Sequence, residues 1–262
     1  MRNPVLGLPS AILPILMLST QCLLVGCATS SQKKIPDDER SALLSNMAAA
    51  SLSDGDPTSA YVELDEADHL TPNDAHIQYL FALTYFQKHE PEKALIAAKR
   101  AVAIDPNFSE AKNTLGRLLM EKGDYAPAEK YLRESATDMK FRDAYVARIN
   151  LGILYYKQGR LDMSEAELSR VLASEPELGC SAAYYRGQIY LQQNKLVEAQ
   201  HDFETSSKNY CTGIFEARLA LGKTLIKRGQ TETAKAKLLE IEQTHPNSPE
   251  ALEAGQILGG LP

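Results

Sequence analysis

Residues 75–108 decide the fold, and they read AHIQYLFALTYFQKHEPEKALIAAKRAVAIDPNF. The pattern predicts two antiparallel helices with a break at residues 88–91. Small residues at the eighth and twentieth positions, Ala82 and Ala94, allow the two helices to approach closely. Pro106 ends the second helix, because proline has no backbone donor with which to continue the ladder. The stretch is therefore one helix–turn–helix unit with its own stop signal.

This layout resembles the tetratricopeptide repeat, a family with a period of 34 residues. Tyr85, Ala98 and Ala101 also occupy positions that the family marks. The same frame fits six times, at 41–74, 75–108, 109–142, 145–178, 180–213 and 215–248. Six units in nearly continuous phase are not a chance match. The resemblance implies an all-α protein, a right-handed superhelix (solenoid) of six such repeats.

Two features of the frame concern its connections. The turn inside a unit recurs with Gly or Asn, residues that suit the positive φ of a short helix–helix turn, at Gly123, Gly159, Asn194 and Gly229. Asp143 and Ala144 are an extra pair between the third and fourth units, where either a helix runs on or the packing changes.

Residues 249–262 follow the last unit. Ser248 can cap a helix and Pro249 suits its first position, while Leu252, Ile257 and Leu258 could cover the last repeat. We expect a capping helix that shields the end of the array, and a disordered tail is the alternative.

The N-terminus carries an export signal. Residues 1–26 have one early charge, Arg2, and then an apolar stretch that Pro9 and Pro14 interrupt. The sequence Leu-Val-Gly-Cys at 24–27 resembles the lipobox of bacterial lipoproteins, in which the Cys, here Cys27, is lipidated and becomes the first mature residue. An ordinary secretory signal is the alternative. Ala28 follows the Cys, and by the family's sorting rule this implies an outer-membrane anchor facing the periplasm.

The mature chain would then begin with lipidated Cys27 and a flexible tether, at 27–40, which is polar and too poor in apolar residues to fold alone. Two cysteines remain after processing. Cys180 opens the first helix of the fifth unit and Cys211 ends its second, so an antiparallel pair brings them together. The periplasm is oxidising, which favours a disulfide, and two separately buried thiols are the alternative.

Charge and motif content exclude several functions. The formal net charge is −6 and Lys and Arg form no run, so we expect no nucleic-acid partner. The five His residues show no ligand spacing, and neither a phosphate loop nor a nucleophile elbow occurs. We therefore predict no catalytic residue, metal, cofactor or small-molecule substrate.

In the tetratricopeptide repeat family the first helices line a concave groove, through positions two, five, nine and twelve of each unit. Carried onto this chain, those positions imply an unusually apolar partner-binding groove that suits a helix or strand with hydrophobic anchors. Its alternative is burial of the same side chains by the curvature of the superhelix. The groove residues are His76, Tyr79, Leu83, Phe86, Arg117, Met120, Ile149, Ile153, Tyr156, Tyr184 and Leu191.

The lipobox, the short tether, six units and the Cys pair of the fifth together resemble the type IV pilus biogenesis and stability lipoproteins of the PilF/PilW type. That resemblance implies a pilotin, which binds the secretin subunit and promotes its outer-membrane localisation and multimerisation, without turnover. The alternative is another periplasmic scaffold lipoprotein, such as a hydrolase or protease adaptor or an outer-membrane protein assembly factor.

Overall fold

The computed structural model describes residues 35–262, so the predicted signal peptide 1–26, the lipidation site Cys27 and most of the tether lie outside the described residues. In the described part every regular element is a helix. The helices are α1 (Asp37–Ser53), α2 (Pro57–Leu70), α3 (Ala75–Gln87), α4 (Pro91–Ile104), α5 (Ser109–Lys122), α6 (Tyr125–Thr137), α7 (Ala144–Lys157), α8 (Leu161–Ser174), α9 (Cys180–Gln192), α10 (Leu196–Thr205), η1 (Asn209–Cys211), α11 (Phe215–Lys227), α12 (Thr231–Thr244) and α13 (Pro249–Gly259).

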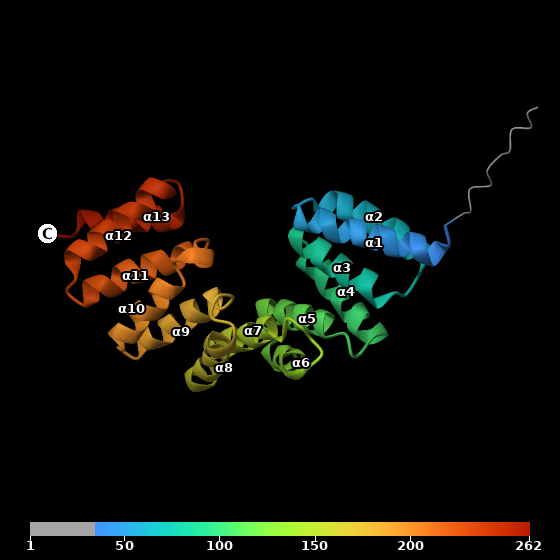
Figure 1. Ribbon diagram of the computed structural model, residues 1–262, viewed down its shortest axis with the longest axis horizontal. Helices are drawn as coiled ribbons and strands as arrows, with labels where there is room; N and C mark the ends of the chain where they lie inside the picture. The colour runs from blue at the N-terminus through green and yellow to red at the C-terminus, as the bar shows by residue number, and fades with distance from the viewer. Residues whose placement is uncertain (1–34) are drawn as a thin grey trace, which may run out of the picture. The chain divides into compact units, whose positions relative to one another are not determined.

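The helices form six consecutive pairs, α1–α2 to α11–α12, that stack in chain order (Figure 1). The first helix of a pair also approaches the first helix of the next from α1 to α9 (α1–α3, α3–α5, α5–α7 and α7–α9), whereas no such approach joins successive second helices among the described residues. The first helices therefore lie on the shorter, inner side of the stack. The predicted all-α solenoid of six repeats with a capping helix is confirmed.

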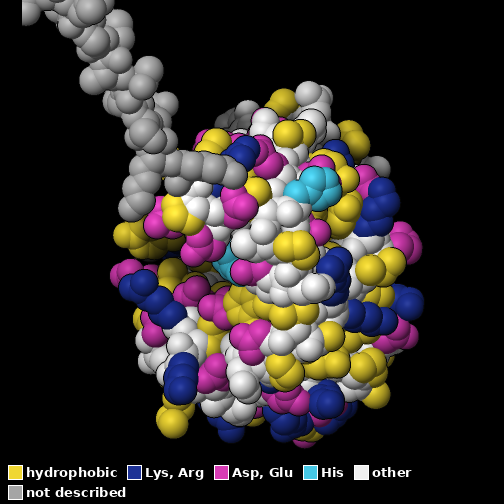
Figure 2. All heavy atoms as spheres, turned by 90° about the vertical axis from the view of Figure 1, so that its right-hand side faces the viewer, with side chains coloured by type: hydrophobic (Ala, Val, Ile, Leu, Met, Phe, Trp, Pro, Cys, Tyr) yellow, Lys and Arg dark blue, Asp and Glu magenta, His cyan; other side chains and the backbone are white. Residues whose placement is uncertain are grey.

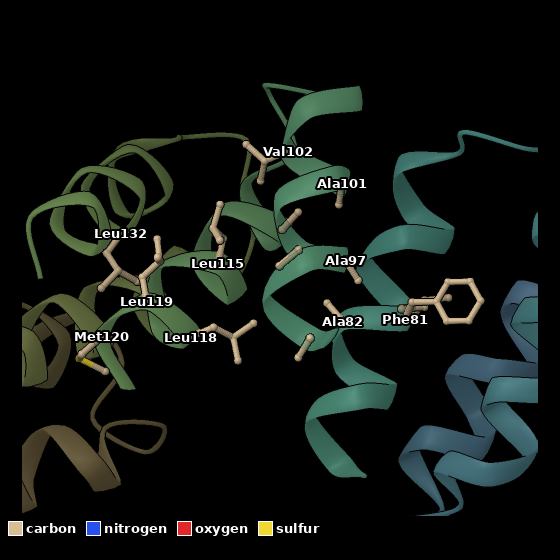
Figure 3. Packing of buried hydrophobic residues seen from close by; sticks show 14 of the residues in the cluster. Phe81, Ala82, Ala97, Ala101, Val102, Leu115, Leu118, Leu119, Met120 and Leu132 are labelled. Carbon is tan, nitrogen blue, oxygen red and sulfur yellow. The ribbon is translucent and has the colours of Figure 1, made fainter. Parts of the chain in front are cut away.

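The core follows the stack as a row of buried clusters, and part of the largest is drawn in Figure 3. Within a pair the two helices come close together where the eighth residue of the unit contacts the twenty-fourth. At Gly116 a methyl group would lie 2.6 Å from Cγ of Leu132, and at Gly187 it would lie 2.8 Å from the Phe203 ring. In the second pair the corresponding residues are both alanine, Ala82 and Ala98, and both are fully buried. Glycine at the eighth position thus makes room for a larger side chain on the facing helix.

Each pair turns through one residue in the left-handed region. The φ values are 76° at Gly55, 88° at Gly123, 72° at Gly159 and 73° at Gly229, and His89 (58°) and Asn194 (57°) occupy the same place in the other two pairs. Left-handed φ suits glycine and is tolerated by asparagine, whereas histidine adopts it at a cost. The predicted turn chemistry accounts for every pair except the second.

One boundary differs from the sequence-based expectation, and a second distinguishes between its two alternatives. Helix α1 begins at Asp37, so the assignment of residues 37–40 to the flexible tether is wrong. Asp37, Asp38 and Glu39 fill its first turn, where acidic side chains interact favourably with the helix dipole. The extra pair before the fourth unit produces a six-residue connection rather than a longer helix. Phe141 of that connection is buried between α6 and α7, against Ala136 and Ala147.

The fifth pair departs furthest from the repeat. Its second helix, α10, has 10 residues, against 14 in α4, α8 and α12. Cys211 therefore lies in the short 3₁₀ turn η1 and not, as expected, at the end of the second helix. Its Sγ atom forms a disulfide with Cys180 at the start of α9, across a Cα–Cα distance of 5.3 Å. The covalent link holds the segment that replaces the last turn of the helix.

Helix α13 covers the end of the array. Ser248 caps it by accepting a hydrogen bond of 3.1 Å from the Ala251 amide. Ala251 and Ala254 are buried against Leu238 and Ile241 of α12. Leu252, in contrast, is 66% exposed, so the expectation that it covers the last repeat is wrong. Ile257 and Leu258 supply that contact.

Candidate partner-binding groove

The inner side of the stack carries most of the predicted groove residues at least partly exposed. His76 is exposed, and the half-buried members of the set are Tyr79, Leu83, Phe86, Arg117, Ile153, Tyr156, Tyr184 and Leu191. Two predictions are wrong. Met120 is 6% exposed and belongs to the core drawn in Figure 3, and Ile149 is 8% exposed and packs between α8 and α9. Both side chains hold repeats together and are not available to a partner.

The N-terminal part of the groove is an aromatic cluster formed by α3 and by Phe108, the residue that precedes α5. The Tyr79 ring meets the Phe108 ring edge to face at a centroid distance of 5.1 Å, and His76 lies 6.1 Å from Tyr79 and 6.2 Å from Phe108. Burial, and to a smaller extent the Glu110 carboxylate, raises the pKa of Tyr79 above 10.0. The phenol is therefore neutral at physiological pH and offers an apolar ring with one polar tip.

Phe86 lies at the turn end of the same helix. The Arg117 guanidinium covers its ring at 3.9 Å, and Arg117 Nη1 also pairs with a Glu121 carboxylate oxygen at 3.0 Å. On its other side Phe86 borders a mainly apolar hollow of about 670 Å³, between the turns of the first two pairs. Its lining residues are Gly55, Pro57, Phe86, Gln87, His89 and Pro91. A hollow of this size with an aromatic wall can hold a hydrophobic side chain of a partner.

A second aromatic cluster lies on α7 and α9. Tyr185 contacts Tyr156 at 5.4 Å and Tyr184 at 5.2 Å between centroids, both edge to face. Gln192 Nε2 donates a hydrogen bond of 2.9 Å to the Tyr156 hydroxyl, which fixes that ring. Burial raises the pKa of both Tyr184 and Tyr185, so these rings also stay neutral.

A side-chain hydrogen bond links α5 and α7 between the two clusters. Asn150 Nδ2 donates to Asn113 Oδ1 at 2.9 Å, which joins α7 to α5. The groove thus offers two aromatic areas separated by a hydrogen-bonded bridge. The sequence argument missed two rings, Phe108 and Tyr185. Phe108 ends the second unit and Tyr185 follows a groove position directly, so a search for aromatic neighbours of the groove set would have found both.

The described part of the chain, residues 35–262, carries charged side chains of both signs on its surface. On the face shown in Figure 2, acidic and basic side chains are interspersed with hydrophobic ones. Among residues 35–262 no group of His, Cys, Asp and Glu could hold a metal ion. Within the same residues no helix is both long and apolar enough to cross a membrane.

Three models described as tetratricopeptide repeat match the chain, at residues 51–118, at 113–178 and 149–204, and at 216–248. The chain belongs to the tetratricopeptide repeat family. The matched segments cover all six helix pairs in whole or in part, including those that line the candidate groove. Members of this family act as scaffolds for protein partners.

Two solved structures share this repeat architecture over most of the chain. Pseudomonas aeruginosa PilF matches at a TM-score of 0.72 with 19% identity, over 84% of this chain and 99% of PilF. PilW, a widely conserved type IV pilus biogenesis factor, matches at a TM-score of 0.72 with 21% identity, over 81% of this chain and 97% of PilW. Tetratricopeptide repeat protein 33 of Xenopus laevis is 39% identical over 75 residues, and the chain spans 29% of its length.

Proposed function

We propose that this repeat protein is an outer-membrane lipoprotein that acts as a pilotin in type IV pilus biogenesis. In this proposal Cys27 carries the lipid, the repeat body faces the periplasm, and the inner groove binds the secretin subunit. Binding promotes delivery of the subunit to the outer membrane and its assembly into multimers. The protein works as a scaffold and turns over no substrate.

The observation that carries the proposal is likeness along the whole length of the pilus factor PilW, 97% of which is covered by this chain. Any repeat protein of this kind matches over a few helix pairs. A match over nearly the whole length of PilW also requires a similar number of pairs and a similar end of the array. The lipobox-like sequence at 24–27 supports the same assignment, because it would hold the body beside the membrane into which a secretin inserts.

The groove gives the proposal a physical basis. A secretin subunit before insertion exposes apolar segments that aggregate in water. Two aromatic clusters and the hollow beside Phe86 can cover such a segment, since exposed apolar and aromatic surface on the inner face of a repeat array is a docking surface for helices and strands.

Deletion of the gene tests the function. The proposal expects the loss of heat-resistant secretin multimers on a gel and the loss of twitching motility. Re-expression of the wild-type chain should restore both, and a Cys27→Ala chain should restore neither fully. Normal multimers and normal motility after deletion would refute the pilotin. Co-purification of a peptidoglycan hydrolase, a protease or an outer-membrane barrel protein in place of the secretin would identify another envelope scaffold.

A pair of groove variants tests the site. Tyr79→Ala combined with Tyr156→Ala should weaken secretin capture, with helical content unchanged. Tyr210→Ala is the matched control, because this ring is 80% exposed on η1 and lies outside the groove set. If capture survives the double substitution, the binding site lies elsewhere on the chain.

A further inference from the structure

The C-terminal end of the groove differs from the rest in both packing and charge. Successive first helices come together along the stack, as α7 and α9 do, but among the described helices α9 and α11 do not approach in this way. A hollow of about 370 Å³ lies there, lined by residues of α9, α11 and the start of α13. Its volume lies in the range of sites that bind small ligands and side chains.

The floor of this hollow is apolar. Leu219 and Ala220 of α11 are each 6% exposed, and Tyr184 and Leu191 of α9 form the facing wall. Pro249, the first residue of α13, also lines the hollow. A side chain that passes the rim and enters the hollow therefore packs mainly on aliphatic and aromatic carbon.

The rim carries an excess of negative charge. Lys223 Nζ pairs with a Glu253 carboxylate oxygen at 2.5 Å, so the charges of these two residues offset each other. Glu216 and Glu250 also border the hollow, and within residues 35–262 neither carboxylate forms a hydrogen bond or an ion pair. Two unpaired carboxylates over an apolar floor match the shape of a lysine or arginine side chain, whose aliphatic stem packs on carbon while its charge stays at the edge.

We propose that this hollow is a cation-selective anchor site, which takes a Lys or Arg side chain flanked by apolar residues in a segment of a protein partner. The inference rests on the proposed function, in which the groove binds a protein, and adds a chemical requirement for the bound segment. The aromatic clusters nearer the N-terminus hold apolar side chains, and the hollow at α9, α11 and α13 fixes the register of the segment by charge.

The test uses the full chain in detergent and three fluorescein-labelled peptides. All three share one short, Leu-rich sequence and differ only at the central residue, which is Lys, norleucine or Glu. We expect the Lys peptide to bind most tightly and the Glu peptide least. Replacement of both free carboxylates, Glu216→Gln with Glu250→Gln, should weaken binding of the Lys peptide about threefold to tenfold and leave the norleucine peptide unchanged.

The matched control removes the same charge elsewhere. Glu92→Gln with Glu198→Gln alters two exposed carboxylates on second helices, which likewise form no ion pair among the described residues. Equal binding of the Lys and Glu peptides, no binding of any peptide, or an equal loss in the control would overturn the inference. If the wild-type chain captures secretin and yet shows no charge preference, only the inference fails. If it shows the preference and captures no secretin, the proposed function fails instead.

Discussion

The contact between Gly116 and Leu132 allows a quantitative test of how the helices of a pair close. Gly116 is buried on α5 and faces α6. A methyl group at Gly116 would lie 2.6 Å from Leu132 Cγ, 2.8 Å from Cδ2 and 3.2 Å from the Leu132 backbone nitrogen. Carbon atoms in van der Waals contact are about 3.5–4.0 Å apart. The Leu132 side chain must therefore move by about 1 Å, and the backbone contact limits how far a change of rotamer can help.

Gly116→Ala should destabilise the protein in spite of its helical setting. Overpacking of a core costs about 1–3 kcal/mol. Replacing a glycine inside a helix by alanine contributes about 1 kcal/mol in the opposite direction. The expected net loss in the free energy of unfolding is about 1 kcal/mol. Leu132→Ala alone leaves a cavity at a fully buried site and should cost about 2–5 kcal/mol.

The double variant should lose less than the sum of the two single variants, since it recreates the Ala82–Ala98 contact of the second pair. Residues in direct contact couple by about 0.5–3 kcal/mol, and we expect a coupling of about 1 kcal/mol here. Urea unfolding followed by circular dichroism measures the four free energies. Gly255→Ala is the control, because a methyl group there meets only the flexible end of Glu242. Additive losses, or a Gly116→Ala chain as stable as wild type, would show that the reasoning about this contact is wrong.

Three further predictions concern single sites. His89→Gly should stabilise the chain by about 0.5–1 kcal/mol in urea unfolding, because it removes the left-handed strain of a histidine at φ 58°. Asp202→Ala should lower the free energy of unfolding by about 3 kcal/mol in the same measurement. The substitution leaves the partly buried Arg186 guanidinium without the carboxylate to which it donates hydrogen bonds of 2.7 and 2.8 Å. Partial burial opposes ionisation of Glu129, but hydrogen bonds, led by the one from Arg160, outweigh it and lower the pKa of Glu129 below 4.5. Wild type should therefore be more stable than Glu129→Gln, by the full amount above pH 4.5 and by less as the pH falls. An advantage that grows on acidification would contradict this assignment.

The helix pairs could be predicted from the sequence because each is defined by local signals. Apolar spacing, small residues at fixed positions and a left-handed turn residue all act within 34 residues, and the structure places the helices where these signals lie. The start of α1 was missed because acidic residues, which indicated a solvated tether, also stabilise the first turn of a helix.

Exposure in the groove could not be predicted in the same way. Phe86 and Met120 occupy the same position of successive units, yet Phe86 is half-buried beside a hollow and Met120 is in the core. The local pattern is the same in both cases. The difference depends on which side chains the neighbouring pairs bring, as with Ile149, which Leu168 and Ala182 cover. Such contacts join residues of different repeats, so a frame laid along one unit carries no information about them.

The fifth pair shows where departures from the repeat concentrate. Its second helix is short, a disulfide holds the segment that follows, and its first helix does not pack closely on the next first helix. In a stack of similar units, a stretch that breaks the local rules reduces the packing between neighbours unless another interaction replaces it. Here the disulfide between Cys180 and Cys211 and the buried ion pair of Arg186 with Asp202 hold the fifth pair itself together, and α10 packs on α11 of the next pair. The packing of α10 on α11 keeps the array continuous, while a hollow with unpaired carboxylates stays open beside α9, α11 and α13.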